Sequence, residues 1–154
     1  MEKIIRYANE KDFNLLREMY LNEVENHEQR AGKFAEDLIF RLKTIICIAN
    51  LKIIGTVSWD TRGGLNDGVI ELIGLGVVQG YRRQGIAKEL VLTLINENKS
   101  FFKLRGYKLR VIYFFMESLN ENGRAFYKSM GFREVSTIPA FYPNDDAVIW
   151  IKYF

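Results

Sequence analysis

The sequence is poor in cysteine, histidine and proline. Its one cysteine, Cys47, excludes an internal disulfide and favours a reducing compartment, so we expect a cytoplasmic location. Its one histidine, His27, lies in the polar stretch ENHEQR and is expected at the surface. A single histidine and a single cysteine do not make a metal-ligand cluster, so no metal is expected. The two prolines, Pro139 and Pro143, both lie near the end of the chain.

Long apolar runs are also absent. No run approaches the roughly 18 residues of a membrane-spanning helix. The opening MEKIIRYANEKDF lacks the apolar stretch of about 7–15 residues that a signal peptide needs. Lys and Arg number 22 against 19 for Asp and Glu, so the net charge is +3. This mild excess fits a site for a small polyanion, whereas nucleic acid usually requires a clustered basic face. We therefore expect a soluble protein with neither a membrane nor a nucleic acid as partner.

The apolar content is sufficient for one α/β domain. Of the 154 residues, 48% are hydrophobic and 14% aromatic, and we expect a single domain over residues 1–154. Hydrophobic periodicity predicts a mixed, mostly antiparallel sheet of about six to seven strands flanked by about four helices. Helices are expected after an N-cap at Asp12, over 34–42, from Ile86 to near Gly106, and over 120–130 with a cap at Gly131. Strands are expected at 3–8, on both sides of 50–52, at 69–78, 108–116, 132–138 and 147–154.

The stretch GYRRQGIA, residues 80–87, joins an apolar strand to an amphipathic helix. A helix N-terminus presents unpaired N–H groups and partial positive charge, and small residues let a phosphate approach the backbone. Arginines add fixed charge and bidentate donors. The pattern predicts a pyrophosphate cradle, with a basic surface turn as the alternative, formed by Arg82, Arg83, Gln84, Gly85, Ile86 and Ala87. Two other phosphate motifs fail, because the chain has no Gly-Lys-Ser/Thr and Gln79 stands where a dinucleotide fingerprint needs its third glycine.

A second motif, NENGRAFYKSMGF, lies downstream on an expected helix. It places an asparagine, a small residue, a tyrosine and a Gly-Phe pair at Asn120, Gly123, Tyr127, Gly131 and Phe132. Together the two motifs resemble the GNAT superfamily of acetyl-CoA-dependent N-acetyltransferases, whose coenzyme loop reads Arg/Gln-x-x-Gly-x-Gly/Ala between a strand and a helix. The sequence departs from the family pattern at Gln79, where proline is common, and at Gly123, where alanine is more usual.

The resemblance implies a GNAT-like fold for the whole chain, acetyl-CoA as co-substrate, and acetyl transfer to a primary amine. By position, the backbone of Val77 and Val78 would pair with the pantetheine arm of the coenzyme. The backbone of residues 83–87 would hold the pyrophosphate, assisted by the Arg82 side chain. Asn120 would hydrogen-bond the pantetheine.

Acetyl transfer needs a base for the acceptor ammonium and an acid for the departing thiolate. The resemblance places Tyr127 near the thioester sulfur as general acid; the alternative is a core tyrosine. Glu71, in the apolar stretch VIELIGL, corresponds to a catalytic glutamate in histone-type members, and burial of a carboxyl suits a base. The alternatives are a sheet glutamate paired with Lys or Arg, and a water chain. Cys47 has apolar neighbours and is expected to be unreactive, which favours direct attack in a ternary complex.

The acceptor is expected to be a peptide or protein N-terminus. In the family the first two helices and the last hairpin wall the acceptor site. Here that hairpin reads IPAFYPNDDAVIW, which resembles the end of peptide N-terminal acetyltransferases, including the ribosomal-protein type. The side chains expected to shape the site and attract a cation are Phe141, Tyr142, Asp145 and Asp146. The alternatives are an ordinary turn at 143–145, a polyamine or aminoglycoside as acceptor, and a CoA-binding sensor without turnover. A homodimer is kept as an alternative to a monomer.

Overall fold

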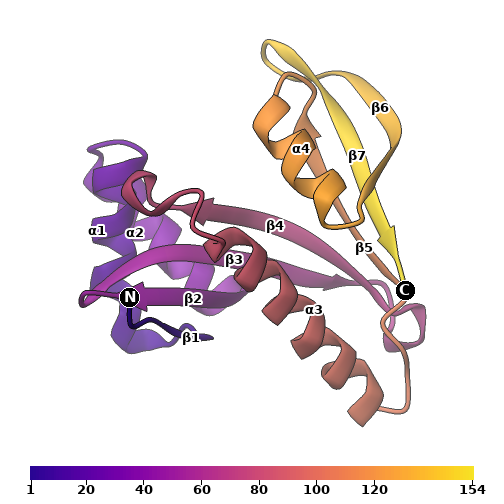
Figure 1. The fold of residues 1–154 in the computed structure, drawn as a ribbon, viewed down its shortest axis with the longest axis horizontal. Coiled ribbons are helices and arrows are strands. Elements are labelled where there is room, and N and C mark those ends of the chain that lie inside the picture. The colour runs from indigo at the N-terminus through magenta and orange to yellow at the C-terminus, as the bar shows by residue number, and fades with distance from the viewer. The chain divides into compact units, whose positions relative to one another are not determined.

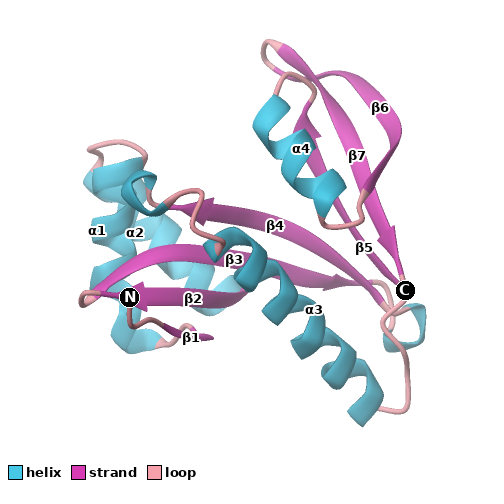
Figure 2. Ribbon diagram, in the orientation of Figure 1, coloured by secondary structure: helices cyan, strands magenta, loops and turns pink.

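Seven strands and four α-helices follow one another in the predicted order (Figure 1 and Figure 2). The structure, a computed structural model, describes all residues from 1 to 154. The strands are β1 (Ile4–Tyr7), β2 (Lys43–Ala49), β3 (Lys52–Arg62), β4 (Val69–Val77), β5 (Val111–Glu117), β6 (Arg133–Tyr142) and β7 (Asp145–Tyr153). The α-helices are α1 (Phe13–Glu23), α2 (Glu28–Glu36), α3 (Ile86–Leu104) and α4 (Glu121–Ser129).

The strands form one mixed sheet in the order β1-β2-β3-β4-β5-β7-β6. β4 and β5 pair in parallel through residues 69–71, whereas the pairs β1–β2, β2–β3, β5–β7 and β6–β7 are antiparallel. Asn50 and Leu51 join β2 to β3 with φ angles of 51° and 62°, the positive values that a tight hairpin turn requires. The predicted α/β class and the mostly antiparallel sheet are confirmed.

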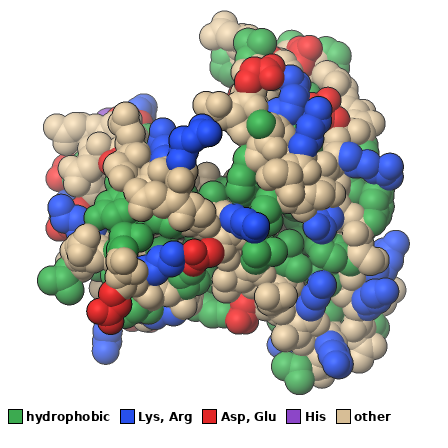
Figure 3. Space-filling view, viewed as in Figure 1, with side chains coloured by type: hydrophobic (Ala, Val, Ile, Leu, Met, Phe, Trp, Pro, Cys, Tyr) green, Lys and Arg blue, Asp and Glu red, His purple; other side chains and the backbone are tan.

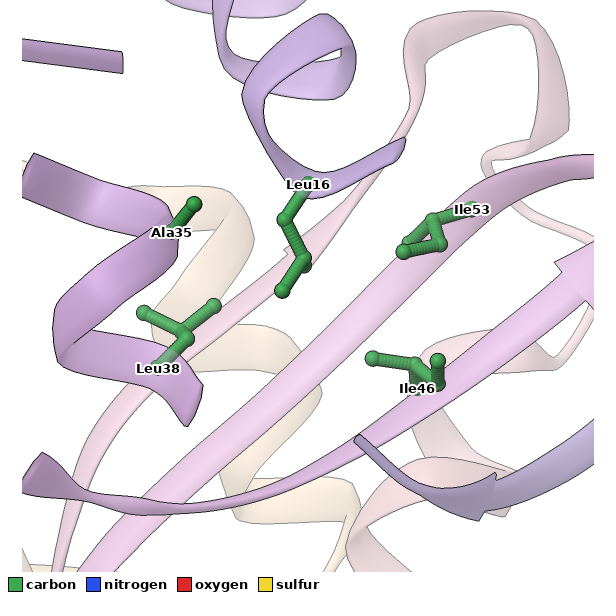
Figure 4. Close-up of a cluster of buried hydrophobic side chains, with 5 residues drawn as sticks. All are labelled: Leu16, Ala35, Leu38, Ile46 and Ile53. Atoms are coloured by element: carbon green, nitrogen blue, oxygen red, sulfur yellow. The ribbon is translucent and has the colours of Figure 1, made fainter. Parts of the chain in front are cut away.

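The chain divides into two compact units, Met1–Asp60 with Ile73–Asn98, and Thr61–Leu72 with Lys99–Phe154. In the first unit, α1 and α2 pack on β2 and β3 through one buried apolar cluster. Figure 4 shows its five members, Leu16, Ala35, Leu38, Ile46 and Ile53. Burying a large aliphatic side chain contributes about 1.5–3 kcal/mol, so this cluster fixes both helices against the strands.

The first half of α3 lies on the opposite face of these strands (Figure 1). A Cβ atom at Gly55 in β3 would lie 3.0 Å from Leu90 and 3.1 Å from Ile86, so the glycine permits close approach of the helix. An ion pair between Lys3 and Glu89, with an N–O distance of 2.6 Å, also holds the helix. The close packing at Gly55 and the ion pair of Glu89 together fix the start of α3, where the predicted phosphate cradle ends.

In the second unit, α4 packs on β5 and β7 through an aromatic cluster. The ring centroid of Tyr127 lies 4.2 Å from that of Phe114, 5.7 Å from that of Phe132 and 6.4 Å from that of Trp150. Gly131 follows α4 with φ +85°, a left-handed conformation that glycine adopts without strain, as predicted for a C-terminal cap.

Two predictions at helix starts are corrected by the structure. Asp12 precedes α1, but its side chain does not cap that helix; it accepts the backbone N–H of Asn9 at 2.8 Å and pairs with Arg6. Asn9 caps the short turn Glu10–Asp12 instead, because its side chain accepts the N–H of Lys11. The second helix begins at Glu28 rather than at residue 34, because His27 caps it. Its first turn is polar, its apolar stripe begins only at the buried Ala31, and the segment Asp37–Arg41 is wound as a π-helix.

Candidate functional site

The predicted phosphate cradle lies in the loop between β4 and α3, within the first unit. The short turn Gln79–Tyr81 follows β4, and the N–H of Tyr81 donates to the carbonyl of Val78 at 2.9 Å. The Nε atom of Arg82 donates to the carbonyl of Val77 at 2.9 Å. The side chains of residues 82–84 are exposed. These bonds hold the loop in shape and leave its outer surface open.

The backbone N–H groups of residues 83–88 have no acceptor within the protein. The first N–H bonded back along the chain is that of Glu89, which donates to the carbonyl of Gly85 at 3.0 Å. Gly85 has φ +82°, and a Cβ atom there would meet nothing within 4 Å. A run of unpaired amides at the N-terminus of a long helix, beside two arginines, can bind a pyrophosphate.

Val77 and Val78, which were predicted to pair with pantetheine, already use part of their backbone. The N–H of Val78 donates to the carbonyl of Ile54 at 2.9 Å, and the carbonyl of Val77 accepts from Arg82. The following residue, Gln79, donates its N–H to the Glu23 carboxylate at 3.1 Å. A proline at this position, common in the family, has no N–H to donate. Gln79 therefore links the loop between β4 and α3 to the end of α1.

A cavity of about 270 Å³ lies beside this loop in the first unit. Its walls come from α1, α2, the π-helical turn, β3 and β4. The lining is mainly apolar with one carboxylate and one guanidinium, and consists of Met19, Glu23, Val24, Phe34, Leu38, Thr56, Ser58, residues 74–78 and Arg82. Gly74 leaves room for the Ser58 side chain, because a Cβ atom at residue 74 would lie 3.1 Å from the Ser58 hydroxyl oxygen.

Two hydroxyl groups that line this cavity, on the buried residues Thr56 and Ser58, were missed by sequence reasoning. Thr56 is 6% exposed and Ser58 is 4% exposed, and neither hydroxyl has a hydrogen-bond partner within the protein. A β-bulge at Ile54 sets the alternation of β3, so that Ile53, Thr56 and Ser58 face the same helices. The signal available in the sequence was a pair of hydroxyls two residues apart in the apolar strand KIIGTVSW.

Glu71, the predicted base, lies in the second unit and is hydrogen-bonded on its strand. Its carboxylate pairs with the Arg62 guanidinium at 3.3 Å and accepts from the Tyr113 hydroxyl at 3.4 Å. Its side chain is 14% exposed. The paired sheet glutamate considered as an alternative is therefore present in the structure. A role as base requires the acceptor proton to reach a carboxylate that already has two donors.

Tyr127, the predicted acid, has a buried ring and an unpaired hydroxyl. The residue is 8% exposed, and the surrounding rings of Phe114, Phe126 and Phe132 account for this burial. Burial raises the pKa of the Tyr127 hydroxyl well above its ordinary value, so the group stays protonated and remains a donor. No side chain or backbone group of the protein bonds to it.

Asn120, predicted to bind pantetheine, caps α4 in this structure. Its Oδ1 atom accepts the N–H of Gly123 at 2.9 Å, and its own N–H donates to the carbonyl of Glu117 at 3.2 Å. Gly123 is close to its neighbours, since a Cβ atom there would lie 2.6 Å from the sulfur of Met116. The glycine that replaces the family's alanine therefore fits the packing of this chain.

The predicted acceptor residues lie on the β6–β7 hairpin in the second unit. Phe141 stacks on Phe115 with centroids 5.5 Å apart and meets the Tyr142 ring edge-on at 5.1 Å. Asp145 accepts from the Ser118 hydroxyl and from the N–H of Leu119. Asp146 accepts the N–H of Ala140 at 2.8 Å. Both carboxylates thus shape loops of the hairpin region, where Phe141 is exposed and Tyr142 is half-buried.

The sequence also singled out Cys47 and His27, for which neither a catalytic nor a metal-binding role was expected. Cys47 is fully buried, and burial raises the pKa of its thiol, as expected for an unreactive cysteine. His27 is exposed, and its Nδ1 atom accepts the N–H of Arg30 at 3.1 Å. The structure contains no group of three or more His, Cys, Asp or Glu residues that could hold a metal ion. None of its helices combines the length and the apolar character needed to cross a bilayer.

Several solved structures share this fold. The ribosomal-protein-S18-alanine N-acetyltransferase of Escherichia coli matches with a TM-score of 0.77 at 20% identity, over 99% of this chain and 94% of that one. Arabidopsis thaliana Naa50, solved with a bisubstrate analogue, matches with a TM-score of 0.75 at 21% identity over 100% of both chains. Arabidopsis thaliana NAA60, solved with acetyl-CoA, matches with a TM-score of 0.75 at 19% identity over 99% of both chains. Comparison with curated protein sequences gave no match.

The family model of the acetyltransferase (GNAT) family matches residues 13–132, which is more than half of the chain. This range contains both sequence motifs, the coenzyme loop and the segment around α4. The resemblance drawn from those motifs is confirmed, and with it the enzyme class and the use of acetyl-CoA. The chain belongs to the acetyltransferase (GNAT) family.

Proposed function

We propose that residues 1–154 form one domain that transfers the acetyl group of acetyl-CoA to the N-terminal amine of a peptide or protein. The acceptor attacks directly in a ternary complex, because the single cysteine is buried and cannot carry the acetyl group. A cytoplasmic location is part of this proposal.

The observation that carries the choice of acceptor is the lining of the cavity beside the coenzyme loop. It offers one carboxylate, Glu23, among apolar side chains and the hydroxyls of Thr56 and Ser58. One carboxylate matches one ammonium group, and apolar walls match an aliphatic side chain beside it. A polyamine or an aminoglycoside carries several cations and would require several carboxylates.

Two solved structures that share the fold support a peptide acceptor. The Escherichia coli enzyme is, by its name, specific for an alanine of ribosomal protein S18. Arabidopsis thaliana Naa50 was solved with the analogue CoA-Ac-MVNAL, in which a peptide is joined to the coenzyme. These two proteins are 20% and 21% identical to this chain.

In the proposed complex, the unpaired N–H groups of residues 83–88 hold the pyrophosphate, and the Arg82 side chain assists. The pantetheine arm runs along Val77 and Val78 and uses the backbone groups that are not already bonded to Ile54 and Arg82. Asn120 contributes through its side-chain NH₂, because its Oδ1 atom is occupied by the cap of α4.

In the proposed reaction, the acceptor nitrogen forms a bond to the acetyl carbon while the bond from that carbon to sulfur breaks. Glu71, directly or through water, receives the proton that leaves the nitrogen. The Tyr127 hydroxyl donates a proton to the departing thiolate, for which its unpaired state is suitable. Phe141 and Tyr142 wall the acceptor, and Asp145 and Asp146 add negative charge near it.

The test is release of free CoA thiol with a panel of acceptors. We expect turnover with peptides that have a free N-terminal amine and an apolar first residue, and none with the same peptides blocked at the N-terminus. Turnover with a polyamine or an aminoglycoside alone would overturn the choice of acceptor. Binding of acetyl-CoA without turnover on any amine would instead indicate a sensor.

A matched pair of variants tests the cavity. Glu23→Gln keeps an oxygen for the N–H of Gln79 but removes the negative charge, so we expect KM for the peptide to rise about tenfold or more. Glu10→Gln, in the exposed turn just before the same helix, should leave KM unchanged. Equal KM values for the two variants would remove the cavity from the acceptor site.

A further inference from the structure

All the charged side chains at the end of α3 and in the segment after it are positive. Residues 99–110, KSFFKLRGYKLR, contain five cationic side chains and no acidic one. On the face shown in Figure 3, Lys and Arg side chains gather over this end of α3. The net charge of the whole chain is only +3, and from this total we expected no nucleic-acid partner. The total does not show that positive charges are grouped in one segment.

Within this segment lies an open groove of about 380 Å³ in the second unit. It is lined by three lysines, two aromatic rings and one leucine, namely Lys99, Lys103, Lys108, Tyr107, Phe154 and Leu109. Tyr107 is 45% exposed, so a face of its ring is open to a ligand. The lining combines ammonium groups with aromatic surface and contains no acidic side chain.

The arginines of this segment are bonded within the protein, whereas its lysines are not paired with carboxylates. The Arg105 guanidinium lies 3.7 Å from the centroid of Phe101 and donates to the carbonyl of that residue. Arg110 donates to the carbonyl of Asp67 at 2.7 Å. The three lysines that line the groove make no ion pair with a carboxylate, and only Lys99 has a ring partner, Phe154 at 5.4 Å. Three ammonium groups are therefore available to a ligand.

We propose that this groove binds single-stranded nucleic acid. The ammonium groups of Lys99, Lys103 and Lys108 contact successive phosphates, and an unpaired base stacks on Tyr107. Single strands fit better than duplex because a stacked base must first be unpaired, and a positive groove with exposed rings is the usual platform for such strands. The proposal does not depend on the choice of acetyl acceptor.

The test is fluorescence anisotropy with a labelled oligouridylate of about 15 nucleotides, near one site size for such platforms. The variant K99A/K103A/K108A should bind at least about tenfold more weakly at low salt. The control K11A/K52A/K128A removes the same charge from exposed lysines elsewhere and should bind like the wild type. Equal weakening in both variants would reduce the effect to net charge and overturn the site.

Salt dependence and stacking give two independent readouts. Each phosphate contact on a single strand contributes a slope of about −0.7 to the logarithmic salt dependence, so losing three should flatten it by about two. Tyr107→Leu should weaken binding roughly fivefold or more at unchanged slope. An oligothymidylate arm separates RNA from DNA, and binding of either supports the proposal. Equal binding of duplex, or binding only to anionic phosphatidylserine vesicles, would overturn it.

Discussion

Between β4 and the start of α3, the N–H groups of residues 83–88 have no acceptor in the protein, whereas most polar groups around α4 are paired. Asn120 caps the helix, Gly131 closes it, and the N–H of Phe132 donates to the carbonyl of Tyr127. The exceptions in this second region are the Tyr127 hydroxyl, the side-chain NH₂ of Asn120 and the buried Nε1 of Trp150. The first region thus presents a run of unpaired amides, while the second uses most of its backbone groups within α4 and its caps.

This difference shows that a sequence motif can reflect either the binding of a ligand or the folding of the chain. Residues of the first motif leave polar groups unsatisfied, and unsatisfied groups favour binding of a ligand that pairs with them. Most residues of the second motif stabilise a helix and its packing, so their spacing alone does not identify catalysis. Among the predicted site residues of that motif, the Tyr127 hydroxyl and the side-chain NH₂ of Asn120 have no partner in the protein.

Tyr127→Phe should have the largest effect. If the hydroxyl donates the proton to the thiolate, turnover should fall by roughly 10²–10⁴ with the affinity for acetyl-CoA unchanged. Because the hydroxyl has no partner in the protein, the melting temperature should stay the same. Steady-state kinetics, calorimetry and thermal unfolding on one preparation measure all three.

The control for this change is Tyr153→Phe, which removes an exposed hydroxyl in the same unit. Wild-type turnover in a stable Tyr127→Phe variant would end the assignment of the acid. The second region would then be purely structural.

The pair Gly85→Asp and Gly85→Asn tests the first region. Both side chains have nearly the same size and tolerate the left-handed backbone better than other residues, so they differ mainly in charge. A carboxylate facing the pyrophosphate costs several kcal/mol, and we expect Gly85→Asp to bind acetyl-CoA about a hundredfold more weakly than Gly85→Asn. Equal dissociation constants by calorimetry would mean that no phosphate lies at Gly85.

Glu71→Gln should lower turnover by only about tenfold near pH 6, because water can partly replace the carboxylate as base. The ratio to wild type should recover as pH rises, since a deprotonated amine needs less help from a base. Glu134→Gln, which removes another arginine-paired carboxylate of the sheet, should show no such dependence. A constant ratio from about pH 6 to about pH 9.5 would leave Glu71 with its ion pair to Arg62 as its only role.

Asn120→Ala should destabilise the protein by about 1 kcal/mol, the usual loss for an N-cap. Asn120→Asp keeps the cap and should keep the stability. If Asn120 also donates to pantetheine, both variants lose that NH₂ group and should bind acetyl-CoA more weakly by a similar factor. Unchanged affinity in both would restrict Asn120 to the cap.

Asp145→Asn should have the smallest effect, and one that depends on pH. The Ser118 hydroxyl, followed by backbone N–H groups, holds the pKa of Asp145 below its ordinary value. Stability from a lowered carboxyl pKa is present above the unfolded-state value of about 3.9 and is lost as pH falls through the folded-state value. The variant should therefore melt below the wild type at neutral pH, and the difference should shrink in acid; a pH-independent difference would contradict this.

The element order and both motifs could be read from the sequence because they depend on local patterns. The hairpin at Asn50 and Leu51 and the cap at Gly131 are examples in which neighbouring residues determine the conformation. The start of α2 was missed because the cap residue is a histidine and the first turn is polar. Its buried positions before Phe34 are filled by Ala31 alone, a small side chain that gives only a weak hydrophobic period.

The surroundings of the site depended on contacts between distant segments. The ion pair of Glu71 with Arg62 follows from strand register, which its own neighbours in the chain do not specify. The same holds for the hydroxyls of Thr56 and Ser58, which line a cavity only because the buried cluster around Leu16 fixes α1 and α2. Residue types were visible in the sequence, whereas their partners were not.

The most direct measurement is amide hydrogen exchange with and without acetyl-CoA. Without it, residues 83–88 should exchange rapidly, because their N–H groups have no acceptor. With it, we expect strong protection of these amides, and little change at the capped amides of Gly123 and Gly131. Saturating acetyl-CoA that leaves residues 83–88 unprotected would contradict the assignment of this loop as the pyrophosphate site.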